Sequence, residues 1–300
     1  MNTKVIRIDS RMSDLISSQL SEFQKIQQQL EKLSYPCSVK FDLLDLNFVY
    51  PCFILPLCCL AQKLLAKQCE VTFDFQETYL STIGFPNGIN PQTDTKWLEK
   101  IESYKNKTYL PIIQFPAKKN NDATKIRRSF LDSVYNLLRH NLNLSASVFS
   151  AIAYLLSEMT DNIIDHACVE NGWFFAQYYP TKGYLDVIIA DNGVSIYGSY
   201  QKNNKQYIKD HKSALEKALQ GESTKHETGR GFGIRTTRSM LVEGMKGKFL
   251  ILSGNALFVN EENEESIIQM PTIWQGTILI MRIPDKDNIP TDFNYHKYTQ

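Results

Sequence analysis

The stretch Glu158-Met-Thr-Asp-Asn162-Ile-Ile-Asp165-His166-Ala167 decides how the second half of this chain folds. It places a carboxylate and an amide four residues apart in a helical pattern that is otherwise apolar. Residues i and i+4 lie on the same face of an α-helix, so Glu158 and Asn162 are neighbours. Burying such a pair is costly unless something binds it. The stretch therefore predicts a ligand site beside a long helix.

Two glycine-bearing segments follow this helix. Asp191-Asn-Gly193-Val-Ser195 ends an apolar strand pattern, and Gly229-Arg-Gly231-Phe232-Gly233-Ile precedes a second helical pattern. Glycine lets the backbone approach a ligand closely, and free amides at a helix start bind anions. Each segment alone is a weak signal, because a lone Asp-Asn-Gly is an ordinary turn. After the first stretch, at this distance, the signal becomes specific.

The three segments, in this order, resemble the ATP site of the GHKL superfamily. That superfamily includes gyrase, the MutL mismatch-repair proteins, the heat-shock chaperone ATPases and the histidine and anti-sigma kinases. The resemblance covers residues 124–284 and implies the Bergerat α+β two-layer sandwich of the family, with ATP and Mg²⁺ as cofactors. The expected order is helix–helix–strand–strand–lid–helix–strand–strand.

The resemblance also implies roles for individual residues. Glu158 matches the base that accepts a proton from the attacking water, and Asn162 matches the magnesium ligand. Asp191 matches the carboxylate that accepts a hydrogen bond from the adenine amino group. Where the family has a further glycine, this chain has Ser195. The remaining residues implied in nucleotide binding are Asp165, Gly193, Gly229, Gly231, Phe232, Gly233 and Thr277.

These residues also have other interpretations. A Rossmann glycine motif follows a strand, whereas this one follows a polar insertion, and a protein-kinase loop lacks its HRD and DFG partners here. For His166, a structurally hydrogen-bonded histidine is favoured over a catalytic one. Phosphate contacts and ordinary solvated charges stay equal alternatives for Lys225, His226 and Arg230.

Composition limits the class of protein. The chain has 300 residues, 43% hydrophobic and 22% charged, as in globular proteins with one large domain or two ordinary ones. A net charge of +1 gives no electrostatic case for nucleic acid or an anionic membrane as the main partner. The longest apolar run, 48–61, is too short to span a bilayer and contains two prolines. With no visible secretory signal, we expect a cytoplasmic protein.

The six cysteines form no CxxC pair. Metal or redox chemistry is one interpretation, and buried reduced thiols acting as small hydrophobes is the favoured one. Reduced thiols fit a cytoplasmic location. The cysteines are Cys37, Cys52, Cys58, Cys59, Cys69 and Cys168.

Residues 1–120 are expected to form a smaller α/β domain. Strands are predicted at 4–9, 38–46 and 70–75, and helices at 13–33, 47–67 and 78–83, with Asn47 as a helix cap. The order, with the segment 41–46 and the helix after it, resembles a STAS-like domain, the fold of anti-sigma factor antagonists. Those proteins carry a phosphorylated serine or threonine at the head of the second helix, where this chain has Val49-Tyr50-Pro51-Cys52. A structural or docking role is therefore favoured.

Residues 121–300 are expected to form the ATP-binding domain. Helices are predicted at 124–141 and at 145–167, the second capped by Ser145. Strands are predicted at 172–179, 184–190, 248–253 and 276–283, with a polar insertion over 197–228 as the lid and a helix to about residue 242.

Three functions follow as hypotheses. The first is a slow ATPase whose lid closure is coupled to a protein partner or to self-association. The second is a Ser/Thr protein kinase of the anti-sigma type, and the third is a non-catalytic ATP-dependent switch. A topoisomerase or mismatch-repair protein is not expected, because only a short tail follows Pro284 where those proteins have a transducer domain. A sensor histidine kinase is not expected either, for want of a dimerising histidine helix.

Overall fold

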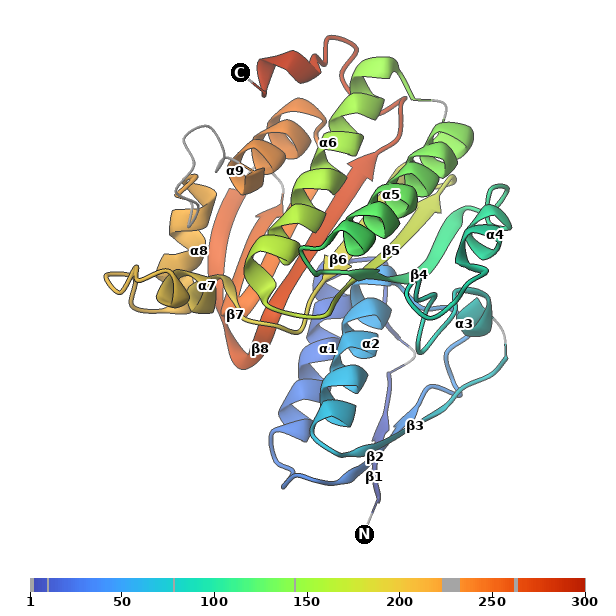
Figure 1. Ribbon diagram of the computed structural model, residues 1–300, viewed down its shortest axis with the longest axis vertical. Coiled ribbons are helices and arrows are strands. Elements are labelled where there is room, and N and C mark those ends of the chain that lie inside the picture. Colours follow the sequence, from blue (N-terminus) through green and yellow to red (C-terminus); the bar gives the residue numbers. More distant parts are fainter. Residues whose placement is uncertain are drawn as a thin grey trace.

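The computed structural model describes residues 3–9, 11–77, 79–142, 144–222, 233–261 and 264–299. It has a mixed α/β fold built on two sheets (Figure 1). One is a parallel three-stranded sheet of order β1-β2-β3, and the other is an antiparallel five-stranded sheet of order β4-β5-β6-β8-β7. Helices pack on both faces of the larger sheet.

The smaller sheet comes from alternating strands and helices, as the sequence predicted. Its elements are β1 (Thr3–Arg7), α1 (Ile16–Leu30), β2 (Ser38–Asp42), α2 (Pro51–Ala66) and β3 (Glu70–Asp74). The helix expected to be capped by Asn47 begins later, at Pro51, after Tyr50 in an extended conformation. Proline disfavours helical dihedrals in the residue before it and suits the first helical position. Cys52, in the segment that replaces the phosphoacceptor, is fully buried.

The larger sheet begins before the domain boundary predicted near residue 120. Its strands are β4 (Tyr109–Pro116), β5 (Asn171–Tyr179), β6 (Tyr184–Ala190), β7 (Lys248–Glu261) and β8 (Glu264–Pro284). The edge strand β4 pairs antiparallel with β5, with Phe115 opposite Gly172. The strands predicted at 248–253 and 276–283 are parts of the longer β7 and β8, which continue past the sheet as a hairpin.

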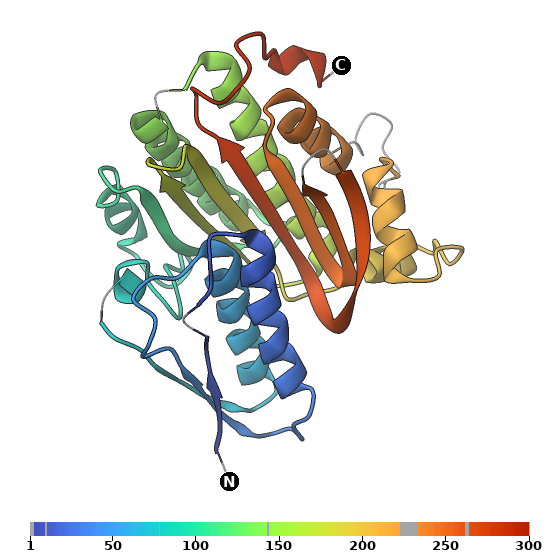
Figure 2. The same ribbon diagram turned by 180° about the vertical axis from the view of Figure 1, so that it is seen from behind.

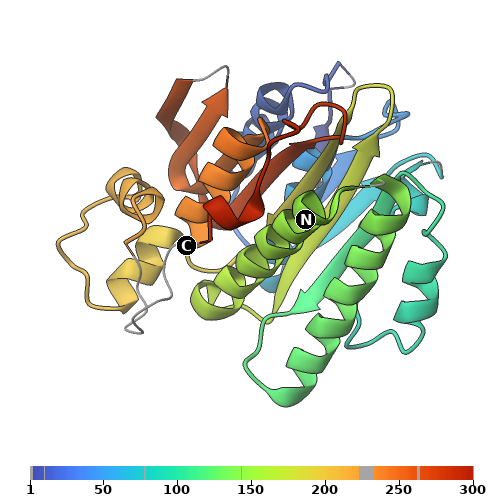
Figure 3. The same cartoon turned by 90° about the horizontal axis from the view of Figure 1, so that it is seen from above.

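Helices cover the two faces of this sheet separately. On one face lie α5 (Asn121–Leu142), α6 (Ala146–Asn162) and α9 (Gly233–Arg238), and Figures 2 and 3 show α1 and α2 against the other. Neighbouring residues of β5 divide between the two cores: Phe174 packs with the α5–α6 side and Phe175 with the α1–α2 side. Each strand therefore has apolar side chains on both faces. The core on the α1–α2 side therefore contains residues of both units expected from the sequence.

The remaining described elements are short. They are α3 (Tyr79–Thr82), α4 (Trp97–Glu102), η1 (Ile163–Ala167), α7 (Ile196–Lys202), α8 (His211–Leu219), η2 (Ser239–Gly244) and η3 (Tyr295–Lys297). The elements α7 and α8 occupy the segment predicted as a polar lid. A capping box joins Asp210 and Ser213 at the start of α8, a signal that the sequence contains and that predicts a helix there.

The N-cap prediction for α6 is confirmed. The hydroxyl of Ser145 accepts a hydrogen bond from the backbone N–H of Val148 at 3.3 Å. The helix reaches residue 167 as predicted, but its last turn widens into the π-helix η1 and ends at Cys168 in a left-handed conformation, with φ of 56°. Single π-turns often occur at functional sites, because they redirect side chains.

Two further expectations concern membrane-spanning helices and the burial of the cysteines. Across the described ranges, no helix combines the length and apolar character needed to cross a membrane. All six cysteines are free, and four of them are buried. The favoured interpretation as small core hydrophobes therefore holds for Cys52, Cys58, Cys59 and Cys69, whereas Cys37 is half-buried and Cys168 exposed.

The shared core predicts how an isolated fragment of residues 121–300 behaves. The fragment lacks β4 and bares an apolar sheet face, which α1 and α2 cover in the whole chain. We expect it to bind the dye ANS and to lose the sharp unfolding transition of the full chain, measured by near-UV circular dichroism. Cooperative unfolding without dye binding would show that residues 1–120 form a separable domain. The exposed face would carry Trp173, Phe175, Ile188, Ile278 and Ile280.

Candidate functional site

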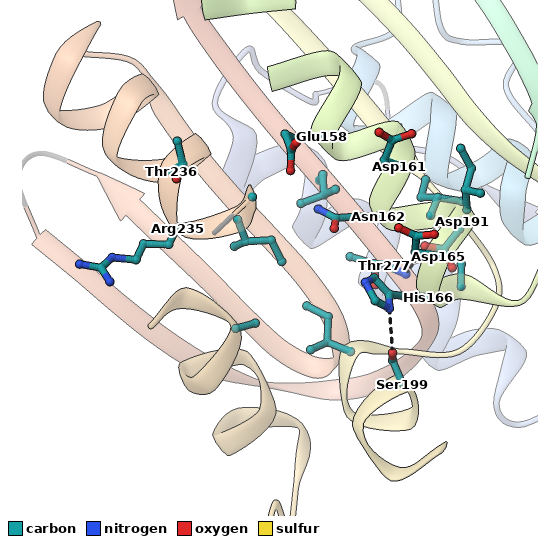
Figure 4. A pocket seen from close by; sticks show the side chains of 18 of the residues that line it. Glu158, Asp161, Asn162, Asp165, His166, Asp191, Ser199, Arg235, Thr236 and Thr277 are labelled. Carbon is teal, nitrogen blue, oxygen red and sulfur yellow. Dashed lines mark hydrogen bonds between the residues drawn. The ribbon is translucent and has the colours of Figure 1, made fainter. Parts of the chain in front are cut away.

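A cavity of about 1190 Å³ lies beside the C-terminal end of α6. Its wall is formed by α6 and η1, the connection from β6 to α7, the start of α9 and part of β8 (Figure 4). Such a volume accommodates a nucleotide-sized ligand. Of the residues predicted for the site, it is lined by Glu158, Asn162, Asp165, Asp191, Gly233 and Thr277. The predicted residues Gly229, Gly231 and Phe232 lie outside the described residues.

Asp191 is a buried carboxyl group in the cavity wall, with 1% of its surface exposed. Its Oδ1 accepts a hydrogen bond from the backbone N–H of Gly193 at 2.9 Å, and its Oδ2 accepts one from Thr277 N–H at 3.2 Å. Burial raises the pKa of this carboxyl group to about 7, and the two backbone hydrogen bonds act in the opposite direction. The group is therefore balanced between hydrogen-bond acceptor and donor near neutral pH.

Gly193 is required by a close backbone contact. A Cβ atom at this position would lie 2.0 Å from the carbonyl oxygen of Ala167, the last residue of η1. The same carbonyl accepts a hydrogen bond from Val194 N–H at 2.9 Å. The end of β6 is thereby fastened to the end of the α6–η1 helix, which brings Asp191 to the cavity that Asn162 lines.

Glu158 lies against the start of α9. A Cβ atom at Gly233 would be 2.4 Å from Oε2 of Glu158, so any other residue there would displace the Glu158 carboxylate. Two segments separated by about seventy residues thus meet at one carboxylate, as the order of motifs predicts. The nearby hydroxyl of Tyr154 has its pKa raised to about 12, by burial first and by the charge of Glu158 second.

Asn162 carries a polar atom without a protein partner. Its Nδ2 is buried, and the part of the chain that the structure describes offers it no hydrogen bond. An unsatisfied buried donor of this kind costs about 1–3 kcal/mol. Because the residue lines the cavity, a ligand rich in oxygen atoms would remove that cost. The amide also has an oxygen of the type that Mg²⁺ prefers.

Asp165 and His166 connect the site to neighbouring segments. Asp165 forms an ion pair with Lys119, a residue of the loop before α5. The Nζ atom of Lys119 lies 2.7 Å from Oδ1 of Asp165. His166 places its Nδ1 3.4 Å from the hydroxyl of Ser199 on α7, the dashed contact in Figure 4. That contact agrees with the favoured interpretation of a structurally hydrogen-bonded histidine.

Ser195, the departure from the family pattern, has a structural task. Its hydroxyl caps α7 by accepting a hydrogen bond from Gly198 N–H at 3.2 Å. It also lies 3.3 Å from Nδ1 of His211, the first residue of α8. A glycine at this position would leave α7 uncapped, at a cost of a few tenths of a kcal/mol or more.

Several residues of the site escaped the sequence reasoning. The hydroxyl of Ser253 accepts a hydrogen bond from Ile196 N–H at 2.8 Å and lies 3.2 Å from Oγ1 of Thr277. It joins β7, β8 and the head of α7 beneath the cavity. No motif distinguishes a serine at the end of a strand, so no sequence signal points to it. The same holds for the lining residues Lys119 and Arg127, which belong to a polar loop and a helix start.

Comparison of the chain with protein-family models, with curated proteins and with solved structures finds no match. The site must therefore be judged from its own groups. Among the described residues, no three His, Cys, Asp or Glu side chains gather closely enough to hold a metal ion by themselves. Mg²⁺ bound through one protein oxygen and the oxygens of a phosphate ligand needs no such cluster.

The pKa of Asp191 predicts a pH-dependent effect of the variant Asp191→Asn. The unfolded chain releases this proton near pH 3.8, whereas the folded protein holds it to about pH 7. The stabilisation it gives is complete below pH 3.8 and is lost as pH rises through 7, in total on the order of 4 kcal/mol. Urea unfolding should therefore show the stability of the variant, relative to wild type, increasing from pH 4 to pH 8. A difference that does not change with pH would contradict the raised pKa.

Proposed function

We propose that the cavity binds Mg-ATP in a Bergerat-type site of the GHKL kind. The observation that carries the proposal is the meeting of three separate segments at one cavity. These are the Glu158–Asn162 pair on α6, the buried Asp191 at the end of β6, and Gly233 at the start of α9. The antiparallel sheet with α5, α6 and α9 on one face gives further support to the proposal.

Asp191 is the proposed base-recognising residue. Adenine presents an amino group as a donor where guanine presents a carbonyl oxygen, so an acceptor carboxylate selects adenine. Its two backbone hydrogen bonds hold the carboxylate in place before the ligand enters. Thr277, which supplies one of them, lines the cavity as well.

Asn162 and the start of α9 are the proposed binders of the phosphate end. The unsatisfied amide of Asn162 fits a site completed by oxygen-rich ligands. Magnesium, when bound with the nucleotide, supplies positive charge to the terminal phosphates. Gly233 keeps the helix start close enough to Glu158 for both to face one ligand.

Glu158 is the proposed general base, accepting a proton from the attacking water. We propose slow hydrolysis that serves as a switch, read by a protein partner or by a second copy of the chain through the segments around the cavity. Residues 1–120, whose sequence resembles a STAS-like domain, are proposed to dock a partner in such a switch. The need for ATP, and the free cysteines, lead us to propose a cytoplasmic location.

The pH dependence of ATP binding tests the role of Asp191. The ionised carboxylate is a stronger acceptor for the adenine amino group than the protonated one, so affinity measured by calorimetry should fall as pH is lowered below about 7, by at most about tenfold for each pH unit. Asp191→Asn should abolish binding at pH 8 while the circular dichroism spectrum stays unchanged. If wild-type protein binds no adenine nucleotide, with or without Mg²⁺, the proposed function is wrong.

The variant Glu158→Gln tests the proposed base. It keeps the shape and polarity of the side chain but cannot take a proton, so we expect unchanged ATP affinity and about 100-fold slower phosphate release or more. Glu243→Gln is the matched control, because Glu243 lines the same cavity from η2 and its carboxylate contacts Ser239. Equal turnover of both variants would remove Glu158 from this role.

Radiolabelled ATP separates hydrolysis from transfer to a protein. Label should appear in free phosphate if water is the acceptor. Label in a partner protein, lost in the Glu158→Gln variant, would instead identify a kinase. Binding without release of phosphate in any mixture would identify a passive switch.

A further inference from the structure

Trp274 lies on the far side of Asp191 from the cavity and is completely buried. Its indole N–H donates a hydrogen bond to the backbone carbonyl oxygen of Asp191 at 3.1 Å. Asp191 is therefore held by four hydrogen bonds: backbone N–H groups donate to its two carboxylate oxygens, the indole donates to its carbonyl, and its own N–H donates to the carbonyl oxygen of Thr277 at 2.9 Å. Burying an indole N–H with a partner satisfies a donor that would otherwise be costly.

The two N-terminal helices hold this indole in place. Phe23 of α1 meets the ring edge-on, with ring centroids 5.6 Å apart and an interplanar angle of 69°. Lys63 of α2 places its Nζ 5.6 Å from the ring centroid. Figure 2 shows these helices lying against the sheet on the side that faces away from α6. The contact joins residues 1–120 to the back of the candidate site.

An irregular part of β8 brings Trp274 to this position. Between Thr277 and Gln269, β8 advances by eight residues while its partner β7 advances by only three, from Ser253 to Ala256. The additional residues are anchored on α1, where the buried hydroxyl of Thr272 donates a hydrogen bond to Oε1 of Gln27 at 3.1 Å. A bulge of this size redirects side chains and is found near functional sites.

We propose that Trp274 is a positioning residue through which α1 and α2 set the placement of Asp191 in the cavity wall. The alternative is that Trp274 only fills the core. The role of Asp191 toward adenine rests on the proposed function, whereas the placement of its carboxyl group does not. Residues 1–120 would then act on nucleotide affinity through a fixed contact beneath the base.

Charged and titratable groups near this contact come from α2. Cys59 lies within electrostatic reach of Asp191, and the pKa of its thiol is raised well above the usual value, by burial first. Lys63 has its pKa lowered to about 8, by burial first and by the charge of Lys67 second. A titration of Asp191 should therefore be measured below pH 8, where Lys63 keeps its charge.

The variant Trp274→Phe tests the proposal. It keeps an aromatic ring in the core and removes only the N–H donor and the second ring. If Asp191 then shifts, its hydrogen bonds to Gly193 and Thr277 lengthen, and the carboxyl pKa rises. We expect an upward shift of the Asp191 titration, followed by ¹³C NMR in nucleotide-free protein, and about three- to tenfold weaker ADP binding.

The matched control is Trp173→Phe. Trp173 is 2% exposed and belongs to the same core, and it lies on β5, which β6 separates from β8. The Trp173→Phe variant removes the same side-chain volume from the same core, so we expect the titration of Asp191 and the ADP affinity to remain as in wild type. Equal effects of the two variants would show that Trp274 is core filling only.

A milder variant, Thr272→Val, covers the case in which Trp274→Phe does not fold. It breaks the hydrogen bond to Gln27 and keeps the side-chain shape, so we expect the same upward shift of the Asp191 titration, smaller in size. An unchanged titration in the folded variants would overturn the positioning role. If the titration of Asp191 shifts in the variants but the wild-type protein itself binds no ADP, the positioning role is supported and the proposed function is overturned.

Discussion

A carboxyl group kept out of water is the constraint on which this site depends. Asp191 ends a buried strand, and the cost of its burial is offset by two backbone N–H groups and lowered further by protonation near neutral pH. The free-energy cost of burying a carboxyl group indicates that the group has a role other than packing. A group that destabilises the empty fold and faces a cavity is typical of a binding residue rather than of a structural one.

The surrounding structure holds that carboxyl group in place. Gly193 fastens the end of β6 to the last turn of the α6 helix, so the carboxyl group and the Glu158–Asn162 pair belong to one rigid frame. Behind them, Trp274 connects the same strand end to α1 and α2. The strand end that carries Asp191 is therefore linked to α6 and η1 on one face of the sheet and to α1 and α2 on the other.

Much of the local structure could be predicted from the sequence. The capped start of α6, the strands β5 and β6 and the alternation in residues 1–74 follow from periodicity and from capping residues such as Ser145. The strand β4 and the hairpin arms of β7 and β8 could not. The residues of β4 are mostly buried on both faces, and such a strand shows no alternation to recognise. The β8 arm is largely exposed, including Ile268 and Ile273, so its apolar residues mark no buried face. The helix α8 begins with a capping box of Asp210 and Ser213, a local signal that is present in the sequence.

The sequence by itself determined which groups could do chemistry, because the spacing of Glu158 and Asn162 and the glycines after Asp191 depend only on local geometry. Only the tertiary structure decided that these groups line one cavity, since the contacts of Gly193 with Ala167 and of Gly233 with Glu158 join distant segments. The tertiary structure also decided that the two units share a core and that burial raises the pKa of Asp191. Burial and packing are sums over residues far apart in the chain, so no short pattern of residues encodes them.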